Sequence, residues 1–260
     1  MTGGLRRIAL ETVAIVDAGR YSHPVVRMVE LEGVASAVAG TRHHLPEEVL
    51  SGCGAASQRP VIEVTTESTL QAAARLGEAA ATLVFASAKS PGGGFLGGAR
   101  AQEESIARSS ALHRCQLAVP EFYAYHRKAG DPYYSDRVIY SPGVPVFRDD
   151  DGALLAKPYR TSFLTAAAPN VRDRPELVAG AREVVRRRAL RVLEVAAAHG
   201  HRSLVLGAWG CGAFRNDPAT VAAAFAHALA TVNRFDHIVF AIRDRLEGMP
   251  AYRAFADQFG

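Results

Sequence analysis

The sequence predicts an α/β fold in a single domain of 260 residues. Short apolar runs rich in β-branched and aromatic residues are typical of buried strands, and they alternate with segments whose apolar residues recur at the period of a helix. Two of the predicted strands end in glycine-rich stretches, at residues 92–98 and 207–212. We therefore expect a sheet flanked by helices, with the chemistry at the carboxyl ends of its strands.

The first quarter of the chain predicts an accessory helix followed by the edge of the sheet. Residues 6–16 have the helical period and Gly19 ends it, so residues 1–20 are expected to pack in front of the core. Residues 25–31 can form a strand of the sheet, residues 40–50 a loop with a short helix, and residues 52–60 a turn of small residues. Residues 61–65 alternate as a strand, and residues 66–68 cap a helix that runs to Leu76.

The central stretch begins with an apolar strand at residues 81–85 and continues into a loop with five glycines. Glycines adopt positive φ and let the backbone approach another molecule, so the loop can hold a phosphate on its amides. Neither the Walker pattern nor GxGxxG fits it. Gln102, Glu103 and Glu104 then open a helical pattern that continues to Cys115. Acids in a first turn usually complement the helix dipole, but beside an anion-binding loop they are candidates for catalysis.

The second half continues the alternation. Residues 119–127 and 132–134 are rich in aromatic rings, which pack in a core or line a ligand site. Strands are expected at 138–140, 144–147, 161–168, 203–206 and 237–242, a hairpin turn at 149–152, and helices at 175–198, from about Pro218, and at 249–259. The 175–198 helix carries five arginines on what we expect to be a solvated face, which could also recruit an anionic polymer: Arg182, Arg186, Arg187, Arg188 and Arg191.

Composition limits the class of protein. The net charge of +4 and a pI near 9.1 weakly favour a polyanionic substrate. Cys53, Cys115 and Cys211 are few and far apart, which argues against a disulfide framework or a structural zinc, and we expect no metal and no cofactor. No segment has the length of a signal peptide or a membrane helix, so we expect a cytoplasmic protein without a membrane partner.

Two sequence blocks carry a resemblance to a known family. PGGG at residues 91–94 is followed, after seven residues, by QEE at 102–104, and WGCGAFRNDP occupies residues 209–218. From about Tyr21 to the C-terminus the chain resembles the bacterial-type poly(ADP-ribose) glycohydrolases. The resemblance implies a macrodomain-like three-layer α/β/α fold with a mixed central sheet and an N-terminal helical extension. It also implies hydrolysis of the ribose-ribose O-glycosidic bond of poly(ADP-ribose) from chain ends, releasing ADP-ribose. ADP-ribosylated proteins are then the expected partners, without specific binding of nucleic acid.

The adjacent positions of Glu103 and Glu104 limit the catalytic roles that the two residues can have. Side chains at i and i+1 of a helix point about 100° apart, so Glu103 and Glu104 cannot face each other across a sugar. The resemblance makes Glu104 the acid and then the base, and makes Glu103 the residue that holds the distal ribose hydroxyls. Gln102 would orient one of this pair or the ribose.

The resemblance assigns the remaining contacts to the two loops and to one acid. Glu67 would accept a hydrogen bond from the adenine amino group, and Phe214 would pack over the distal ribose and diphosphate. Ser90 stands where the family commonly has Asn, which loosens the expected contact with that ribose. The residues expected to surround the diphosphate are Gly92, Gly93, Gly94, Gly210, Cys211, Gly212, Ala213 and Arg215, of which Arg215 could equally face solvent.

Other functions stay open at this stage. The protein could act on another ADP-ribose derivative, such as a mono-ADP-ribosyl or O-acyl adduct. It could be a macrodomain that binds ADP-ribose without chemistry, although such a reader has no use for two acids at an anion site. An unrelated nucleotide-binding fold would require both matching blocks to be coincidental.

Overall fold

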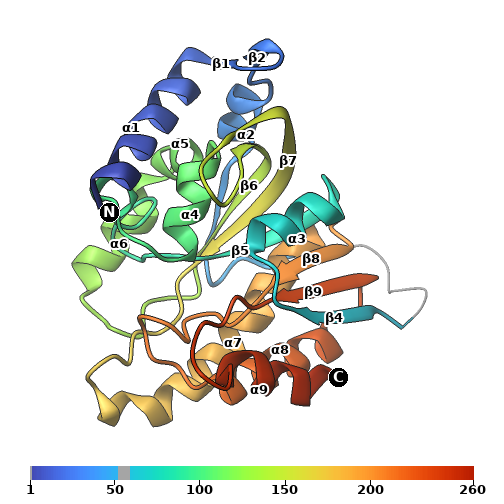
Figure 1. Ribbon diagram of the computed structural model, residues 1–260. Helices are drawn as coiled ribbons and strands as arrows, with labels where there is room; N and C mark the ends of the chain where they lie inside the picture. Colours follow the sequence, from blue (N-terminus) through green and yellow to red (C-terminus); the bar gives the residue numbers. More distant parts are fainter. Residues whose placement is uncertain (1, 52–58) are drawn as a thin grey trace.

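The computed structural model describes residues 2–51 and 59–260 and is built around one mixed sheet (Figure 1). Its seven strands lie in the order β3 (Arg42–His44), β6 (Val138–Arg148), β7 (Leu154–Ala166), β5 (Ala80–Phe85), β8 (Ser203–Leu206), β9 (His237–Ala241) and β4 (Val61–Thr65). From β7 to β4 the strands are parallel, whereas β6 pairs antiparallel with both β3 and β7. The parallel strands therefore end at one common edge.

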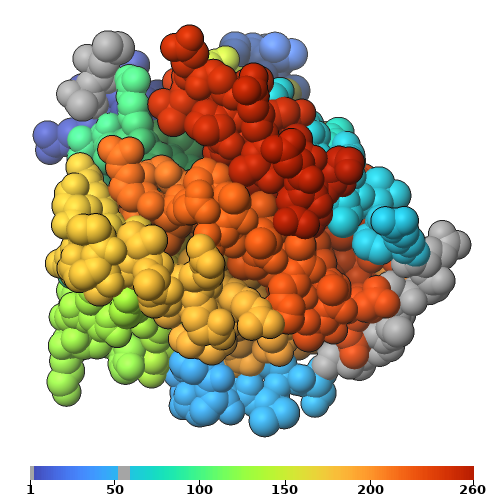
Figure 2. Space-filling view, turned by 90° about the horizontal axis from the view of Figure 1, so that it is seen from below, coloured from blue at the N-terminus to red at the C-terminus, as the bar shows by residue number. Residues whose placement is uncertain are grey.

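Helices cover both faces of the sheet, which gives the expected three layers. One face carries α7 (Val178–Ala198), α8 (Pro218–Thr231) and α9 (Pro250–Phe259), which form the gold-to-red surface in Figure 2. The other face carries α2 (Val34–Gly40), α3 (Thr69–Leu76), α4 (Gln102–Ser109) and α5 (Leu112–Leu117). Helix α1 (Thr2–Ala18) packs on the outside of α4, and α6 (Pro120–Ala129) follows α5. The macrodomain-like fold with an N-terminal helical extension is confirmed.

Strand β5 forms the centre of the core because its side chains are buried on both sides. Residues 80–84 are buried in full, as expected for a strand inside a two-sided sheet. Leu83 belongs to the cluster under α7 and α8, whereas its neighbour Val84 packs with Ile106 and Leu112 of α4 and α5. Because successive side chains of a strand point to opposite faces, this one apolar run contributes to the hydrophobic cores on both sides of the sheet.

Several predicted elements occur where the sequence placed them. Strands β4, β5, β8 and β9 match their predicted runs, and Ser68 caps α3 through a capping box with Gln71. The turn at 149–152 joins β6 to β7 as a hairpin. The two predicted strands at 138–140 and 144–147 are one strand, β6, with a register shift between Ser141 and Val144. The helical pattern after Gln102 is interrupted at Ser110, which bridges to Val146, so it forms α4 and α5.

The N-terminal quarter differs from the prediction. Residues 25–31 do not join the central sheet, because β2 (Arg27–Glu30) pairs with β1 (Arg20–His23) as a separate two-stranded sheet. Strand β3 and helix α2 were not predicted; β3 has only three residues, too few for a periodic signal. Most of the predicted turn at 52–60, with Cys53, lies outside the described residues.

The basic face predicted on α7 is only partly solvated. Arg188 is fully buried and donates to Asp136 and to the carbonyls of Tyr133 and Ala167. Arg191 is 7% exposed and donates to the carbonyls of Leu45 and Glu48. Both guanidinium groups therefore fasten α7 to neighbouring loops, and neither is available to an anionic polymer.

Candidate active site

Two glycine-rich loops meet at the carboxyl ends of neighbouring strands. The first loop, residues 86–101, follows β5 and contains a short 3-10 helix, η1 (Phe95–Gly97). The second loop, residues 207–217, follows β8, which pairs with β5 in parallel. The two loops therefore lie side by side at the common edge, as the sequence predicted, and α4 begins directly after the first.

Glu103 is held inside the protein. The residue is only 2% exposed. Its Oε2 accepts from the Ser87 amide at 2.6 Å, and its Oε1 accepts from Gln116 Nε2 at 3.0 Å. Burial raises the pKa of Glu103 to about 8, and this effect outweighs the two hydrogen bonds, which act in the opposite direction. At neutral pH the protonated, uncharged form of Glu103 therefore predominates.

Glu104 is the acid that substrate can reach. It is partly exposed, and its Oε1 accepts from the Gly94 amide at 3.0 Å. Gly93 has a φ of 59°, and a Cβ at this position would overlap Oε1 of Glu104 and lie 3.1 Å from Oε2 of Glu103. Glycine is therefore required here both by the backbone conformation and by the two carboxyl groups that lie against it.

The amides of the first loop already have acceptors within the protein. Gly92 donates to Gln116 Oε1 at 2.7 Å, Gly93 donates to the carbonyl of Ser90 at 3.0 Å, and Gly94 donates to Glu104. These hydrogen bonds fix the loop on the acids and give no support to a phosphate cradle formed by the three amides. The predicted contacts of Gly92, Gly93 and Gly94 with substrate stay predictions.

The second loop offers free donors. Within residues 2–51 and 59–260, no acceptor bonds the amides of Gly212, Ala213 or Phe214, and Gly212 and Ala213 are exposed. Gly210 has a φ of 74°, and a Cβ there would meet Ala168 Cβ and Asn216 Nδ2, each at 2.5 Å. Consecutive unpaired amides in a tight turn form a site for an anion.

Helix α8 does not contribute its own N-terminus to this site. Asp217 caps the helix by accepting from the Thr220 amide at 2.9 Å, and Pro218 has no amide proton to offer. An anion would therefore bind on the loop before the helix, in contrast to the usual arrangement at a helix N-terminus. Burial also raises the pKa of Cys211 to about 12, so this residue of the loop stays a neutral thiol.

Phe214 lies in the second loop next to Tyr134. Its ring is partly buried against the core and lies 6.1 Å from the ring of Tyr134, and its carbonyl accepts from the Val171 amide at 3.1 Å. Arg215, which follows it, is exposed with a φ of 63°. Of the aromatic residues considered for the site, Phe122 and Tyr123 are buried in the core, and Tyr134 is the one that reaches Phe214.

The side chain of Gln102 makes hydrogen bonds to β5 and α3. Its Oε1 accepts from the Phe85 amide at 2.8 Å, and its Nε2 donates to the carbonyl of Leu83 at 2.8 Å and to Thr69 Oγ1 at 3.2 Å. The side chain thus connects the start of α4 to the end of β5. Its amide oxygen and nitrogen are both used in these contacts, which differs from the predicted role of orienting one of the glutamates or the ribose.

Glu67 and Ser90 follow different strands of the sheet. Glu67 follows β4 at the edge of the sheet, where hydrogen bonds from Arg75 lower the pKa of its carboxyl group. Ser90 is exposed in the first loop, and its amide donates to Ser87 Oγ at 3.2 Å. Their predicted contacts with adenine and ribose stay predictions.

Gln116 is the residue that sequence reasoning missed. It is fully buried in α5, where its side chain joins the Gly92 amide to the carboxyl group of Glu103. The available signal was an amide within the apolar positions of α5, next to Cys115. A buried amide must find partners, but the sequence does not say which.

Two features are absent from residues 2–51 and 59–260. No group of three or more His, Cys, Asp or Glu side chains is placed to hold a metal ion. Within the same part of the chain, no helix has the length and apolar character needed to cross a bilayer.

Comparisons with known proteins agree on one family. Residues 9–149 match the family described as microbial-type PARG, catalytic domain. The chain is similar to the crystal structure of a poly(ADP-ribose) glycohydrolase from Thermomonospora curvata, with 51% identity, a TM-score of 0.93, and coverage of 99% of this chain and 100% of that one. A structure of that enzyme bound to the inhibitor ADP-HPD aligns with 50% identity, a TM-score of 0.90 and the same coverage.

A second organism supplies a structure with a nucleotide. Poly(ADP-ribose) glycohydrolase from Deinococcus radiodurans in complex with ADP-ribose aligns with 44% identity and a TM-score of 0.81, covering 88% of this chain and 98% of that one. A comparison with curated proteins finds no match.

Proposed function

Because the chain belongs to the microbial-type poly(ADP-ribose) glycohydrolase family, we propose that it hydrolyses the ribose-ribose bond of poly(ADP-ribose) with Glu104 as the acid. The family match and the alignments with enzymes bound to ADP-HPD and ADP-ribose support a glycoside hydrolase that binds ADP-ribose. The observation that carries the role of Glu104 is its partly exposed carboxyl group, which the Gly94 amide of the first loop fixes in place.

The first step of the reaction is the departure of the leaving ribose. Glu104 gives its proton to the glycosidic oxygen, and the C–O bond to the distal ribose breaks, which leaves an oxocarbenium-like centre. The diphosphate of the same ADP-ribose unit lies on the free amides of Gly212, Ala213 and Phe214. Because these donors are fixed by the turn, the distal ribose is held in place while the bond breaks.

The second step is the attack of water. Glu104, now a carboxylate, takes a proton from a water molecule as that water adds to the distal ribose carbon, and free ADP-ribose results. Glu103 is buried beside it with its pKa raised to about 8, so its neutral form predominates and adds no second charge next to Glu104. The fixed position of Glu103 suits a residue that orients the ribose.

The substrate would be the free end of a chain. We propose that the polymer is attached to ADP-ribosylated proteins and that these are the cellular partners, without specific recognition of nucleic acid. Glu67 lies after β4 and the second loop after β8, so a nucleotide that reaches from one to the other places its distal ribose beside β5. A cytoplasmic location stays a prediction.

One experiment tests this function. Poly(ADP-ribose) is incubated in EDTA with the wild type, with Glu104→Gln, and with Glu121→Gln, which changes another first-turn glutamate, in α6. We expect release of ADP-ribose by the wild type and by Glu121→Gln, and a loss of about 10²–10⁴-fold in kcat for Glu104→Gln. Equal turnover by Glu104→Gln would remove this residue from the mechanism. Binding of polymer without release by the wild type would identify a reader.

A further inference from the structure

A basic pocket lies next to the candidate active site, at the carboxyl end of β7. It has a volume of about 140 Å³ and is lined by Lys89, Gly130, Pro132, Tyr134, Asn170, Arg172 and Arg174. Three of these residues are cationic and none is acidic. The volume is below the ~300–1,000 Å³ of pockets that enclose a whole small ligand, so the pocket suits one anionic group of a larger molecule.

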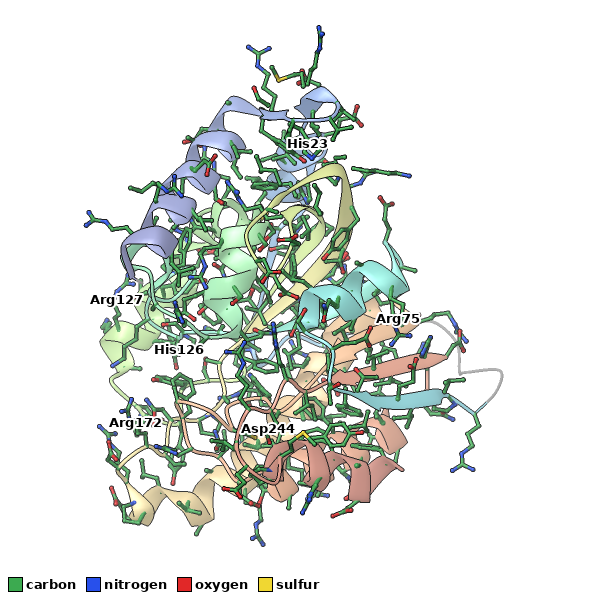
Figure 3. All side chains as sticks on the ribbon, in the orientation of Figure 1. His23, Arg75, His126, Arg127, Arg172 and Asp244 are labelled. Carbon is green, nitrogen blue, oxygen red and sulfur yellow. The ribbon has the colours of Figure 1, made fainter. Side chains whose placement is uncertain are left out.

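The pocket is fixed to both loops of the active site. Lys89 belongs to the first loop, and its carbonyl accepts from an Arg127 guanidinium nitrogen at 2.7 Å. The turn that carries the two arginines is held at its start, where the Asn170 amide donates to the Pro132 carbonyl at 2.9 Å and the Val171 amide donates to the Phe214 carbonyl at 3.1 Å. Arg127 and Arg172 lie on the same side of the molecule in Figure 3, opposite to Arg75.

The cations of this pocket lack the close acidic partners that several other arginines of the chain have. Arg75, Arg187 and Arg188 each pair with an acid. Within the part of the chain that the structure describes, Lys89 and Arg174 have no such partner, and Arg172 meets only Asp173, at 3.5 Å, where both side chains are largely exposed. An exposed pair of this kind contributes little, so the positive charge of the pocket is left for another molecule.

The strand order places the pocket beyond the bond to be broken. Along the common edge the strands run β4, β9, β8, β5 and β7: Glu67 follows β4, the second loop follows β8, the first loop with Lys89 follows β5, and the segment with Arg172 and Arg174 follows β7. Strand β7 lies on the side of β5 away from β8 and β4, so the segment with Arg172 and Arg174 leaves the sheet beyond the strand that leads to Glu104. In the proposed binding mode, the chain on the leaving side of the glycosidic oxygen continues in this direction.

We propose that this pocket binds a phosphate of the next ADP-ribose unit, the one that carries the leaving oxygen. The inference rests on the proposed function and adds to it a subsite for the polymer itself. Every unit of poly(ADP-ribose) has a diphosphate, so the leaving chain always brings an anion to this side of Glu104. Three cations at fixed positions would hold it by charge-assisted contacts.

The test compares a polymer with a substrate that has no second unit. The double variant Lys89→Gln, Arg174→Gln is assayed on poly(ADP-ribose) and on ADP-ribose that carries a neutral aryl leaving group on the distal ribose. We expect KM for the polymer to rise roughly twofold to fivefold for each cation removed, with a weaker dependence on salt, and kinetics on the aryl substrate to match the wild type. The double variant Arg7→Gln, Arg253→Gln removes two exposed arginines elsewhere and should match the wild type on both substrates.

The outcomes separate this inference from the proposed function. An unchanged KM for polymer, or an equal rise in KM on both substrates, would overturn the subsite. If the wild type fails to cleave polymer, the proposed function is wrong, but the subsite can still be tested. Calorimetry then compares the binding of polymer by the wild type and by the double variant. In that case the Lys89→Gln, Arg174→Gln variant must bind polymer more weakly than the wild type while binding ADP-ribose equally, and equal binding of polymer would overturn the subsite.

Discussion

Gly93 and Glu104 form a fitted pair: the space that a Cβ at position 93 would fill is occupied by Oε1 of Glu104. The next residue, Gly94, donates its amide to the same oxygen at 3.0 Å. The first glycine loop therefore holds the carboxyl group of Glu104, and the glycine at position 93 is explained by the two carboxyl groups that lie against it. The anion is left to the second loop, where the amides are free.

Gly93→Ala should therefore reduce kcat while affinity for ADP-ribose changes less. The added methyl group displaces the Glu104 carboxyl group, and a misplaced acid loses part of the ~10²–10⁴-fold that general acid catalysis supplies. Steady-state kinetics on poly(ADP-ribose) and calorimetry with ADP-ribose measure the two effects. Gly97→Ala is the matched control in the same loop, because a Cβ there meets nothing within 4 Å. Wild-type kcat in Gly93→Ala would show that the fitted contact does not hold the acid in place.

Gln116→Met should lower both stability and kcat. Methionine keeps an unbranched side chain but leaves the Gly92 amide without its acceptor and Glu103 without one of its donors. A buried polar group without a partner costs about 1–3 kcal/mol, which urea denaturation would detect as a lower midpoint. Gln258→Met changes an exposed glutamine in α9 and should have neither effect. A Gln116→Met protein with wild-type stability would mean that the two groups find other partners.

The raised pKa of Glu103 predicts that the protein loses stability as the pH rises from 4.5 to 8. Its pKa is raised from the ordinary 4.5 to about 8 in the folded protein, so the folded state binds this proton more tightly than the unfolded state. The contribution is complete below pH 4.5 and is lost as pH rises through 8, at roughly 1.4 kcal/mol for each pKa unit of difference. The free energy of unfolding should therefore fall between these values as pH rises.

The comparison with Glu103→Gln isolates this effect. The amide cannot ionise, so the variant should lack the part of the slope between pH 5 and pH 8 that Glu103 causes. Its NH₂ group also faces the Gln116 donor, which lowers stability at every pH. Urea denaturation between pH 5 and pH 9 measures both slopes. Parallel slopes in the two proteins would mean that Glu103 does not carry the raised pKa.

The sequence predicted the parts of the site that depend on local signals. An apolar run followed by glycines predicts a buried strand and a loop, and this was sufficient for β5, β8 and the loops after them. It could not predict that the amides of Gly92 and Gly94 are taken by Gln116 and Glu104, because those bonds depend on how the loop folds onto α4 and α5. For the same reason the burial of Arg188 was missed: its partner Asp136 lies in a distant segment.

The N-terminal helix also supports the acid. Ala9 is fully buried and packs with Phe95 and Ala107, and Thr12 Oγ1 donates to the carbonyl of Arg108 at 2.6 Å. Phe95 directly follows Gly94, so α1 packs behind the loop segment that holds Glu104. A larger side chain at position 9 should push Phe95 and, through it, the Gly94 amide.

Ala9→Leu should therefore lower kcat as well as stability, with affinity for ADP-ribose unchanged. Overpacking of a buried alanine costs about 1–3 kcal/mol, and the shift of the Gly94 amide weakens the hydrogen bond that positions Glu104. Ala14→Leu adds the same volume to an exposed position of α1 and should leave kcat and stability near wild type. The kcat of Ala9→Leu is measured at a temperature where the variant is folded. If the variant loses stability but keeps its kcat, then α1 stabilises the fold without positioning Glu104.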